Sequence, residues 1–235
     1  MTDSRPRVAI VTFPGSNDDR DALLALELLG AKGVPVWHAD ESLPEVAAVI
    51  LPGGFSYGDY LRCGAIARFS PAMKAVAEFA AAGGLVLGIC NGFQILCEAG
   101  LLPGALRPNA SLSFLCRDVV VRVDRIDTPF TSKCEPGRRL SLPIKHGEGC
   151  WFADRELLAE LEANRQIVLR YELNPNGAVG DVAGVCNERG NVMGLMPHPE
   201  HAVDPLLGST DGAVILGGLV EAARAAAPPL VPTGV

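Results

Sequence analysis

Three side chains of this sequence, a cysteine, a histidine and a glutamate, have the chemistry of a thiol-based acyl-transfer site. Cys90 lies in "GLVLGICNGFQIL", residues 84–96, while His198 and Glu200 lie in "MGLMPHPEHAV", residues 193–203. An imidazole can take the proton of a thiol and later give it to a leaving amine, and a carboxylate on its other nitrogen fixes the tautomer. The three residues would therefore form a complete catalytic triad if the fold brings them together.

The sequence around Cys90 predicts a sharp turn between a buried strand and a helix. Residues 85–89 are apolar apart from one glycine, and the apolar spacing after Cys90 predicts a helix that Gly100 ends. Gly88 and Gly92 stand two residues to either side of Cys90, where they would relieve the crowding of a nucleophile elbow. The start of the helix would favour the thiolate. On this stretch alone, burial of Cys90 as a small apolar residue remains open.

The segment after a predicted strand at 192–196 holds the second part of the site. Pro197 and Pro199 stop this strand from continuing into a helix or a sheet ladder, so the segment should be stiff and extended. Alternation along an extended segment would turn His198 and Glu200 to the same side. Taken alone, the segment is also compatible with an exposed proline-rich turn that carries a solvated acid.

The glycine-rich loop "PGGFSYGDYLRCG", residues 52–64, follows a buried apolar run and supplies candidate oxyanion donors. Glycines let backbone N–H groups come close to a ligand, and acyl-transfer sites combine such groups with the N–H that follows the nucleophile. The loop lacks the spacing of a P-loop or of a dinucleotide-binding fingerprint, and a plain Gly-Gly turn is the alternative. The expected backbone donors and their neighbour are Gly54, Phe55, Asn91 and Gly53.

Composition and charge narrow the class of protein. The chain has 235 residues, of which 49% are hydrophobic and 20% charged, as in an ordinary globular protein with a sizeable core. Its net charge of −7 argues against nucleic acid or an anionic membrane as the main partner. Seven cysteines without a C-x-x-C pair predict a reducing, cytoplasmic setting, with no disulfide framework and no metal site. No signal peptide and no membrane span are expected.

Strand and helix patterns alternate through the first half of the sequence, and this rhythm predicts an α/β fold. We expect three layers, with a mostly parallel open sheet covered by helices on both faces. Short strands separated by turns from about residue 115 onward predict mixed or antiparallel additions in the C-terminal half. One domain is expected over residues 1–235, with its core at about 7–226. The main predicted helices are 19–29, 65–82, 154–164 and 212–226.

The stretches "PGGF", "GICNGFQ" and "PHPE", in this order and at these separations, resemble the class I (triad) glutamine amidotransferase family over residues 8–200. The resemblance implies that Cys90 is the nucleophile, His198 the general acid/base and Glu200 its orienting partner. It also implies that Gln94 contacts the bound glutamine. The family hydrolyses glutamine through a γ-glutamyl thioester and passes the ammonia to a synthetase site.

Three further stretches are similar to a narrower family, the glutaminase subunits of phosphoribosylformylglycinamidine synthase. They are "GGFSYGDYLRCGAIAR", "LLPGALRPNASLSFLCRDV" and "GSTDG". The similarity implies that the chain supplies ammonia for converting formylglycinamide ribonucleotide (FGAR) to formylglycinamidine ribonucleotide (FGAM) in de novo purine biosynthesis. Its partners would be L-glutamine, a large synthetase subunit, and a small third subunit. ATP and Mg²⁺ would bind to the large subunit, and no cofactor is expected in this chain.

The same resemblance implies roles for two loops. The residues that would shape the glutamine pocket are Asn109, Ser113 and Phe114. A docking face or ammonia exit, or alternatively a loop that closes over glutamine, would be formed by Tyr57, Asp59, Tyr60 and Arg62. His201 departs from the family pattern, in which arginine is expected after the H-P-E triplet.

Two other functions stay open at this point: a glutaminase that serves another synthetase, and a cysteine-elbow protease or chaperone of the same fold. Proteins of the second kind take their histidine from elsewhere, often directly after the cysteine, whereas Asn91 follows Cys90 here. His38 and His146 are weaker candidates for the base, because His38 ends an early strand and His146 lies in a "KHGEG" loop.

Overall fold

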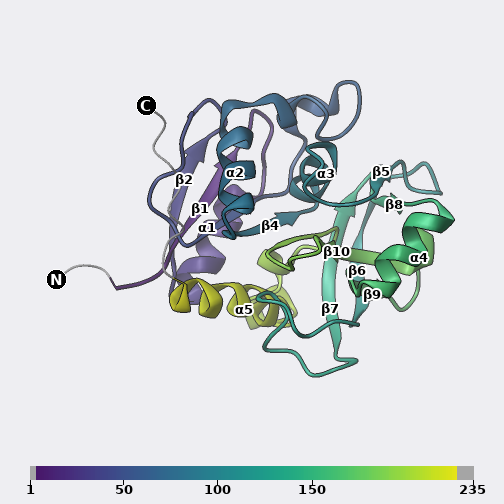
Figure 1. Cartoon of the computed structure of the whole chain (residues 1–235). Coiled ribbons are helices and arrows are strands. Elements are labelled where there is room, and N and C mark those ends of the chain that lie inside the picture. Colours follow the sequence, from purple (N-terminus) through teal and green to yellow (C-terminus); the bar gives the residue numbers. More distant parts are fainter. Residues whose placement is uncertain (1–3, 227–235) are drawn as a thin grey trace.

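The computed structural model describes residues 4–226, which are organised around a nine-stranded sheet (Figure 1). In the strand order given below, the first five strands are parallel to one another. From the fifth strand onward, each strand is antiparallel to the next. The expected α/β fold with antiparallel additions is thus confirmed. Across the sheet the strands are β2 (Lys32–Trp37), β1 (Arg7–Thr12), β3 (Ala48–Leu51), β4 (Leu85–Ile89), β11 (Val192–Leu195), β10 (Val182–Cys186), β9 (Ile167–Tyr171), β6 (Leu115–Val123) and β7 (Arg139–His146).

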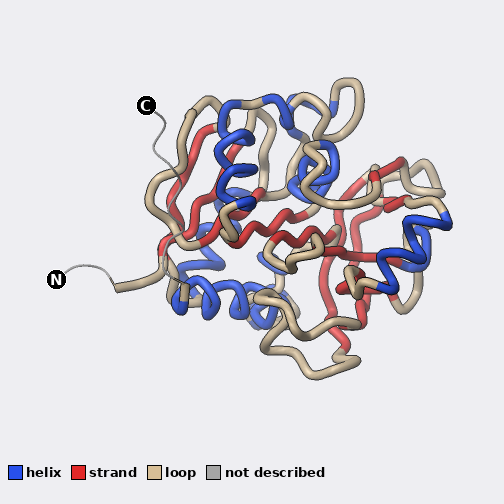
Figure 2. Tube along the Cα trace, viewed as in Figure 1, coloured by secondary structure: helices blue, strands red, loops and turns tan. Residues whose placement is uncertain are grey.

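Helices cover both faces of the parallel half, as the blue segments of Figure 2 show. On one face α1 (Asp19–Leu28) packs against α5 (Gly212–Ala225), and the other face carries α2 (Pro71–Ala81) and α3 (Asn91–Glu98) (Figure 1). The remaining helix, α4 (Arg155–Ala163), lies beside the antiparallel strands. Because parallel strands are covered on both faces, β3 and β4 are continuous buried runs, as the apolar sequence predicts.

The predicted helix 65–82 is divided in the structure. A 3₁₀ turn spans Ala67–Phe69, Ser70 is extended with φ −64° and ψ 144°, and α2 begins at Pro71. A proline disfavours the helical conformation of the residue before it but suits the first position of a helix. Pro71 therefore ends the 3₁₀ turn and starts α2.

A small second sheet, which the sequence did not predict, pairs β5 (Ala105–Arg107) with β8 (Cys150–Phe152). Strands of three residues are too short to show alternation. Trp151 of β8 is fully buried and donates from Nε1 to the Pro103 carbonyl at 3.1 Å. β8 is thereby held against the loop that follows α3. Among the described helices, none is long and apolar enough to cross a membrane.

Candidate active site

Cys90 occupies the turn between β4 and α3 in a backbone conformation that few residues other than glycine adopt. Its φ is 51° and its ψ is −105°. Strain of this kind persists where the surrounding structure enforces it, and it commonly aims a functional side chain. The Cys90 N–H donates to the Leu195 carbonyl at 2.8 Å, which ties the turn to the end of β11. The sharp strand-to-helix turn expected from the sequence is present.

The two glycines beside Cys90 let α3 approach the sheet closely. A Cβ atom on Gly92 would lie 2.0 Å from the Leu51 carbonyl oxygen at the end of β3. A Cβ atom on Gly88 would lie 2.7 Å from the Gly92 carbonyl oxygen. Both positions therefore exclude every other residue type unless the backbone moves, and the free N–H groups at the start of α3 are brought to the strand ends.

His198 and Glu200 follow β11, whose parallel neighbour β4 leads to Cys90. The His198 N–H donates to the Pro143 carbonyl at 2.8 Å, and both side chains are fully buried. His198 Nδ1 and Glu200 Oε1 are 2.6 Å apart. The expected extended segment ends at His198, because Pro199–His201 forms a 3₁₀ turn that brings the Glu200 carboxylate back to the imidazole.

The electrostatic environment of His198 favours its protonated form. Burial opposes the charge, but the Glu200 carboxylate and then the Cys90 sulfur outweigh burial and raise the pKa of His198 to about 10. The Nε2 atom of His198 is buried and has no hydrogen-bond partner among the described residues. The arrangement therefore suits a thiolate–imidazolium pair in which Nε2 carries the mobile proton.

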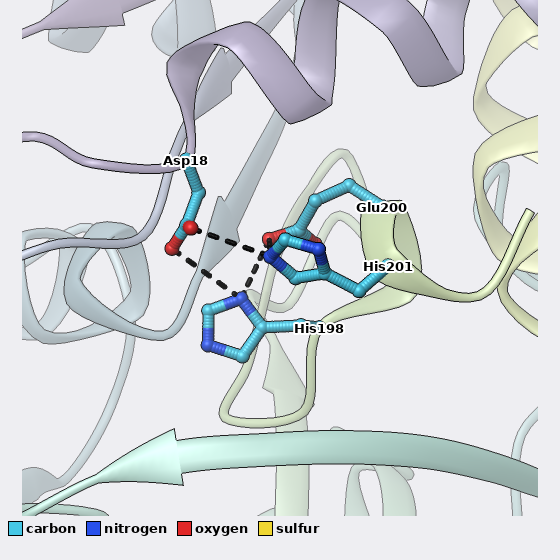
Figure 3. A group of neighbouring side chains, drawn as sticks. All are labelled: Asp18, His198, Glu200 and His201. Atoms are coloured by element: carbon cyan, nitrogen blue, oxygen red, sulfur yellow. Dashed lines mark hydrogen bonds and ion pairs between the residues drawn. The ribbon is translucent and has the colours of Figure 1, made fainter. Parts of the chain in front are cut away.

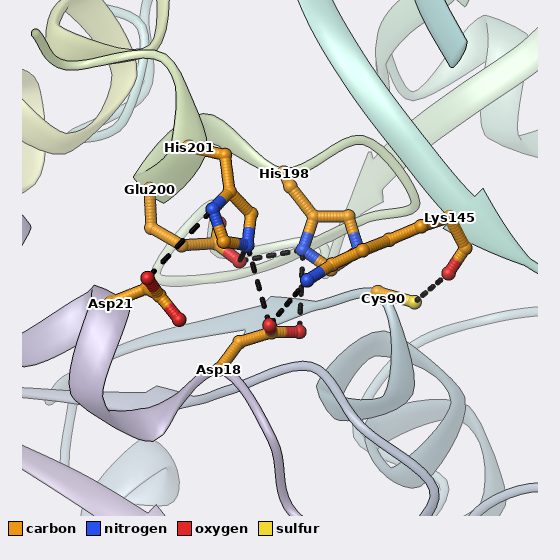
Figure 4. Close-up of polar contacts among 7 residues, drawn as sticks. All are labelled: Asp18, Asp21, Cys90, Lys145, His198, Glu200 and His201. Carbon is orange, nitrogen blue, oxygen red and sulfur yellow. Dashed lines mark hydrogen bonds and ion pairs between the residues drawn. The ribbon is translucent and has the colours of Figure 1, made fainter. Parts of the chain in front are cut away.

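A second carboxylate, Asp18, lies on the same side of His198 as Glu200 and was missed by the sequence analysis (Figure 4). Asp18 Oδ2 is 3.6 Å from His198 Nδ1, and Asp18 Oδ1 is 2.5 Å from Lys145 Nζ and 3.3 Å from His201 Nε2. Burial alone would raise the pKa of Asp18, but the hydrogen bond with His201 and the charges of His198 and Lys145 lower it well below its usual range. Asp18 is therefore a permanent negative charge beside the imidazole.

A cavity of about 120 Å³ opens beside Cys90. Its floor is fixed by side-chain amides: Asn91 Nδ2 donates to Gln94 Oε1 at 2.8 Å, and Gln94 Nε2 donates to the Glu148 carbonyl at 2.7 Å. Asn91 Oδ1 accepts from the Ser56 N–H at 3.2 Å, which joins α3 to the glycine-rich loop. The cavity is lined by Gly54, Phe55, Asp59, Cys63, Cys90, Gln94, Phe114, Lys145, His146, Gly147 and Glu148.

Four lining residues come from the end of β7 and the turn after it; the sequence analysis named only His146 among them, as a weaker candidate for the base. His146 is buried, and burial followed by the charge of His198 lowers its pKa to about 4, so it is a neutral wall of the cavity. His146 Nδ1 lies 3.0 Å from Asn109 Oδ1. The "KHGEG" motif was the available signal, but its distance from Cys90 in the chain hid its place in the site. The four residues are Lys145, His146, Gly147 and Glu148.

The expected oxyanion donors differ in their availability. The Phe55 N–H donates to the Gly15 carbonyl at 2.8 Å, so it is not free to stabilise an oxyanion and this expectation is wrong for Phe55. The centroid of the Phe55 ring lies 6.3 Å from that of the Phe114 ring. The N–H groups of Gly54 and Asn91 make no backbone hydrogen bond among the described residues. Gly53 contributes its carbonyl, which accepts from Asn17 at 3.1 Å.

Two of the expected pocket residues, Asn109 and Ser113, do not line the cavity. Asn109 is fully buried, and its Nδ2 donates to the carbonyls of His146 at 2.8 Å and Ser113 at 2.9 Å. Its Oδ1 accepts from the Gly149 N–H at 3.0 Å. Asn109 thus braces the cavity wall, while Ser113 is exposed.

The expected docking residues separate into different environments. Asp59 lines the cavity, and its Oδ1 atom is buried without a hydrogen-bond partner among the described residues. Tyr57 turns inward, with its hydroxyl 2.8 Å from His38 Nδ1. Arg62 forms a bidentate ion pair with Glu98, in which two guanidinium nitrogens donate to the two carboxylate oxygens at 2.6 Å each. In contrast, the Tyr60 side chain is 75% exposed and remains available to a partner.

Comparisons with known proteins identify the family of this chain. The model of the CobB/CobQ-like glutamine amidotransferase domain matches residues 5–211. A phosphoribosylformylglycinamidine synthase subunit PurQ from Rubrobacter xylanophilus is 60% identical over 218 residues, which cover 93% of this chain and 99% of the relative. The PurQ subunit of Gloeobacter violaceus is 52% identical over 229 residues, which cover 93% and 99%.

Solved structures give the same result. A chain in the structure of PurLQS from Thermotoga maritima has a TM-score of 0.86 and 45% identity, covering 92% of this chain and 98% of that chain. Another glutamine amidotransferase from Thermotoga maritima has a TM-score of 0.57 and 16% identity, covering 94% and 96%. The second likeness shows the fold alone.

Proposed function

The chain belongs to the CobB/CobQ-like glutamine amidotransferase family, and we propose that it is the glutaminase subunit of phosphoribosylformylglycinamidine synthase. In this role it hydrolyses L-glutamine and supplies ammonia for the conversion of FGAR to FGAM in de novo purine biosynthesis. The observation that carries the proposed chemistry is the buried His198–Glu200 pair, 2.6 Å apart, at the end of the strand beside the one that leads to Cys90.

The first half of the proposed reaction is acylation of Cys90. The thiolate attacks the side-chain carboxamide carbon of glutamine, and the oxyanion is stabilised by the N–H groups of Gly54 and Asn91. The proton on His198 Nε2 moves to the amide nitrogen as the C–N bond breaks. Ammonia leaves, and a γ-glutamyl thioester remains on Cys90. The Glu200 carboxylate keeps the ring in the tautomer that this transfer needs.

The second half regenerates the thiol. A water molecule gives a proton to His198 Nε2 and attacks the thioester carbonyl carbon, so that a second oxyanion forms in the same place. When the C–S bond breaks, glutamate leaves and the proton returns to the sulfur or remains on the imidazole as the ion pair. His146 and Phe114 line the cavity in which this step takes place.

The cavity also offers groups for the α-amino end of glutamine. Asp59 and Glu148 both line it, and the Oδ1 atom of Asp59 is buried without a partner among the described residues. A carboxylate in this state is stabilised by an ammonium group, which would supply the missing hydrogen bond. Asp59 thus recognises substrate in this proposal, in place of the docking role that its loop position predicted.

The partners in this proposal are a large synthetase subunit plus a small third one, and ATP and Mg²⁺ bind to the large subunit. Two loops that supply lining residues of the cavity also carry exposed apolar side chains: Leu61 is 89% exposed, Leu112 is 83% exposed and Phe114 is 54% exposed. Together with Tyr60 they form what we call the rim patch. We propose that these side chains contact the synthetase subunits, because large exposed apolar side chains are typical of interaction surfaces. The proposed location is the cytoplasm, where the seven free cysteines would stay reduced.

The test is labelling with 6-diazo-5-oxo-L-norleucine, a reactive glutamine mimic, followed by intact mass measurement and peptide mapping. One adduct on Cys90, prevented by excess glutamine, is expected. The labelling is done with and without the synthetase subunits, because partner docking can order the site. An adduct on another cysteine, or no adduct even in the assembled enzyme, would contradict the proposal.

A further inference from the structure

Asp18, Glu200 and His201 gather around the Nδ1 atom of the His198 imidazole (Figure 3). The ligand atoms of these four residues all lie within 4.8 Å of one another. His198 Nδ1 is 2.6 Å from Glu200 Oε1 and 3.6 Å from Asp18 Oδ2. His201 Nε2 is 3.3 Å from Asp18 Oδ1 and 3.7 Å from Glu200 Oε1. We call these four residues the His–carboxylate cluster.

The His–carboxylate cluster has acceptor capacity that the protein leaves unused. Glu200 Oε2 is buried and has no hydrogen-bond partner among the described residues. Asp18 and Glu200 place two carboxylates here, and within residues 4–226 the one lysine or arginine that contacts either of them is Lys145, through Asp18. A buried carboxylate oxygen without a donor is costly, so a cation held by both carboxylates would be stabilised.

The separations between the ligand atoms suit a four-coordinate metal ion. Bonds of about 2.0–2.2 Å from a tetrahedral zinc ion to nitrogen and oxygen ligands require ligand atoms about 3.4 Å apart. With Asp18 Oδ1 as the ligand atom of Asp18, the separations from His201 Nε2 to Asp18 Oδ1 and to Glu200 Oε1, 3.3 and 3.7 Å, already lie close to this value. The separation of 2.6 Å between His198 Nδ1 and Glu200 Oε1 is a hydrogen bond and would open by under about 1 Å once the proton leaves.

We propose that Asp18, His198, Glu200 and His201 form a Zn²⁺ site whose occupation reversibly inhibits the enzyme. Two imidazoles and two carboxylates form a ligand set that suits zinc, whereas Mg²⁺ and Ca²⁺ take oxygen ligands. The absence of a C-x-x-C pair in the sequence bears on cysteine-based zinc sites only. His201, the departure from the family pattern, supplies the fourth ligand.

Inhibition follows from the nitrogen that the metal would use. Zn²⁺ on Nδ1 of His198 replaces the Nδ1 proton, which passes to solvent, and it separates the ring from Glu200. A neutral ring with its metal on Nδ1 keeps a proton on Nε2, so Nε2 can no longer accept one from the thiol or from water. The inhibitory consequence rests on the proposed glutaminase function, whereas metal binding by itself does not.

Residues of this chain also determine how a metal ion reaches the His–carboxylate cluster and which side chain competes with it. His201 is partly exposed and its Nδ1 lies 3.9 Å from the half-exposed Asp21 carboxylate, so the cluster opens to solvent on this side (Figure 4). The Lys145 side chain is 33% exposed, and its ammonium group occupies Asp18 Oδ1. Lys145 must release Asp18 before a metal ion binds, so this lysine competes with the metal.

The test measures Zn²⁺ and Co²⁺ binding to the full chain, free of other metals and with thiols reduced. Co²⁺ reports geometry, because four-coordinate nitrogen and oxygen ligands give strong visible absorption without the near-ultraviolet band of a thiolate ligand. We expect one Co²⁺ site of this kind that Zn²⁺ displaces. Cys90→Ala should retain it, and His38→Gln, a matched loss of a histidine elsewhere, should also retain it.

Two substitutions should move the affinity in opposite directions. His201→Gln removes a ligand from a partly exposed position and should weaken Zn²⁺ binding by about tenfold or more. Lys145→Gln removes the competing cation and should strengthen it. In the assembled enzyme, Zn²⁺ should lower the glutamine-dependent rate and a chelator should restore it, with His201→Gln less sensitive relative to its own metal-free rate.

The proposal is overturned by a thiolate band in the Co²⁺ spectrum, by loss of the site in Cys90→Ala, or by unchanged affinity in His201→Gln. Binding that leaves the glutamine-dependent rate unchanged would overturn the inhibitory role. A chain that binds Co²⁺ as expected but has no glutaminase activity would contradict the proposed function and leave the metal site standing.

Discussion

The Glu200 carboxylate lies 2.6 Å from His198 Nδ1, although only Pro199 separates the two residues in the chain. The 3₁₀ turn at Pro199–His201 makes this contact possible, because it folds the carboxylate back over the imidazole. The orienting group and the base are therefore held by one short rigid segment, and both depend on the same two prolines for their direction.

Replacement of Cys90 should separate the two activities of the assembled enzyme. Cys90→Ala or Cys90→Ser removes the nucleophile, so glutamine-dependent synthesis of FGAM should fall by at least about 10³-fold. Synthesis from added ammonia should survive, since ammonia bypasses the thioester. Steady-state rates with each nitrogen source would show this. Equal loss of both activities would contradict the division of labour between this chain and its synthetase.

Replacement of the carboxylate partner should have a smaller effect. Glu200→Gln keeps the size of the side chain but removes its charge, and kcat for glutaminase should fall by about 10²- to 10³-fold with little change in KM. Asp18→Asn, at 3.6 Å from the same imidazole, should cost less than Glu200→Gln because Glu200 remains in place. A larger loss for Asp18→Asn would mean that the roles of the two carboxylates are reversed.

His146 should make the protein less stable in mild acid. Burial and the charge of His198 lower its pKa from 6.5 to about 4, so between these values the unfolded chain binds a proton that the folded chain does not. Stability from this group is complete above pH 6.5 and falls as pH decreases toward 4, by at most about 3 kcal/mol. Urea unfolding across this range should show a shallower pH slope for His146→Gln than for the unsubstituted protein.

Gly92 should tolerate no side chain. Gly92→Ala places a methyl group 2.0 Å from the Leu51 carbonyl oxygen, so we expect a loss of about 2 kcal/mol or more in the free energy of unfolding and slower labelling of Cys90. The matched control is Gly217→Ala on α5, where the nearest atom is the flexible Lys133 side chain at 3.5 Å. That change should stabilise the helix by about 0.5–1 kcal/mol. Equal effects at the two positions would contradict the close packing of α3 on β3.

The rim patch should contribute to synthetase binding. Leu61→Asp puts a charge on a side chain that is 89% exposed, so folding should be unaffected while affinity for the synthetase subunits falls by about tenfold. Leu206→Asp, at a leucine that is 93% exposed, is the matched control. Analytical ultracentrifugation or calorimetry of the complex would measure both. A similar loss for the two variants would show a general effect of charge.

The parts of the site that depend on neighbouring residues in the chain were predictable, because a short stretch of sequence contains everything they need. The elbow at Cys90 needs an apolar run, two glycines and a helix, and all lie within residues 84–96. Asp18 was not predictable, because its partners Lys145 and His201 are 127 and 183 residues away in the chain. Its position before α1 is typical of a capping residue, yet the side chain makes no cap hydrogen bond.

In the fold, too, features set by a short stretch of sequence were predictable, and features set by contacts between distant residues were not. The parallel strands β3 and β4 are continuous buried runs that the sequence displays directly, whereas β5 and β8 have three residues each and gain their order from pairing and from buried Trp151. Pro71 was a signal in the sequence for the division of the helix, since proline restricts the residue before it. The signal was overlooked because the apolar spacing on both sides of Pro71 is that of a helix.

The place of β11 in the sheet has a consequence for how the protein is made. β11 lies between β4 and β10, so it joins the parallel half of the sheet to the antiparallel half, and it is the last strand among the described residues. A ribosome releases the elbow and its cysteine about a hundred residues before it releases β11. The growing chain therefore carries its nucleophile without its base, and the thiol gains hydrolytic power only after β11 and the segment that follows it have been made.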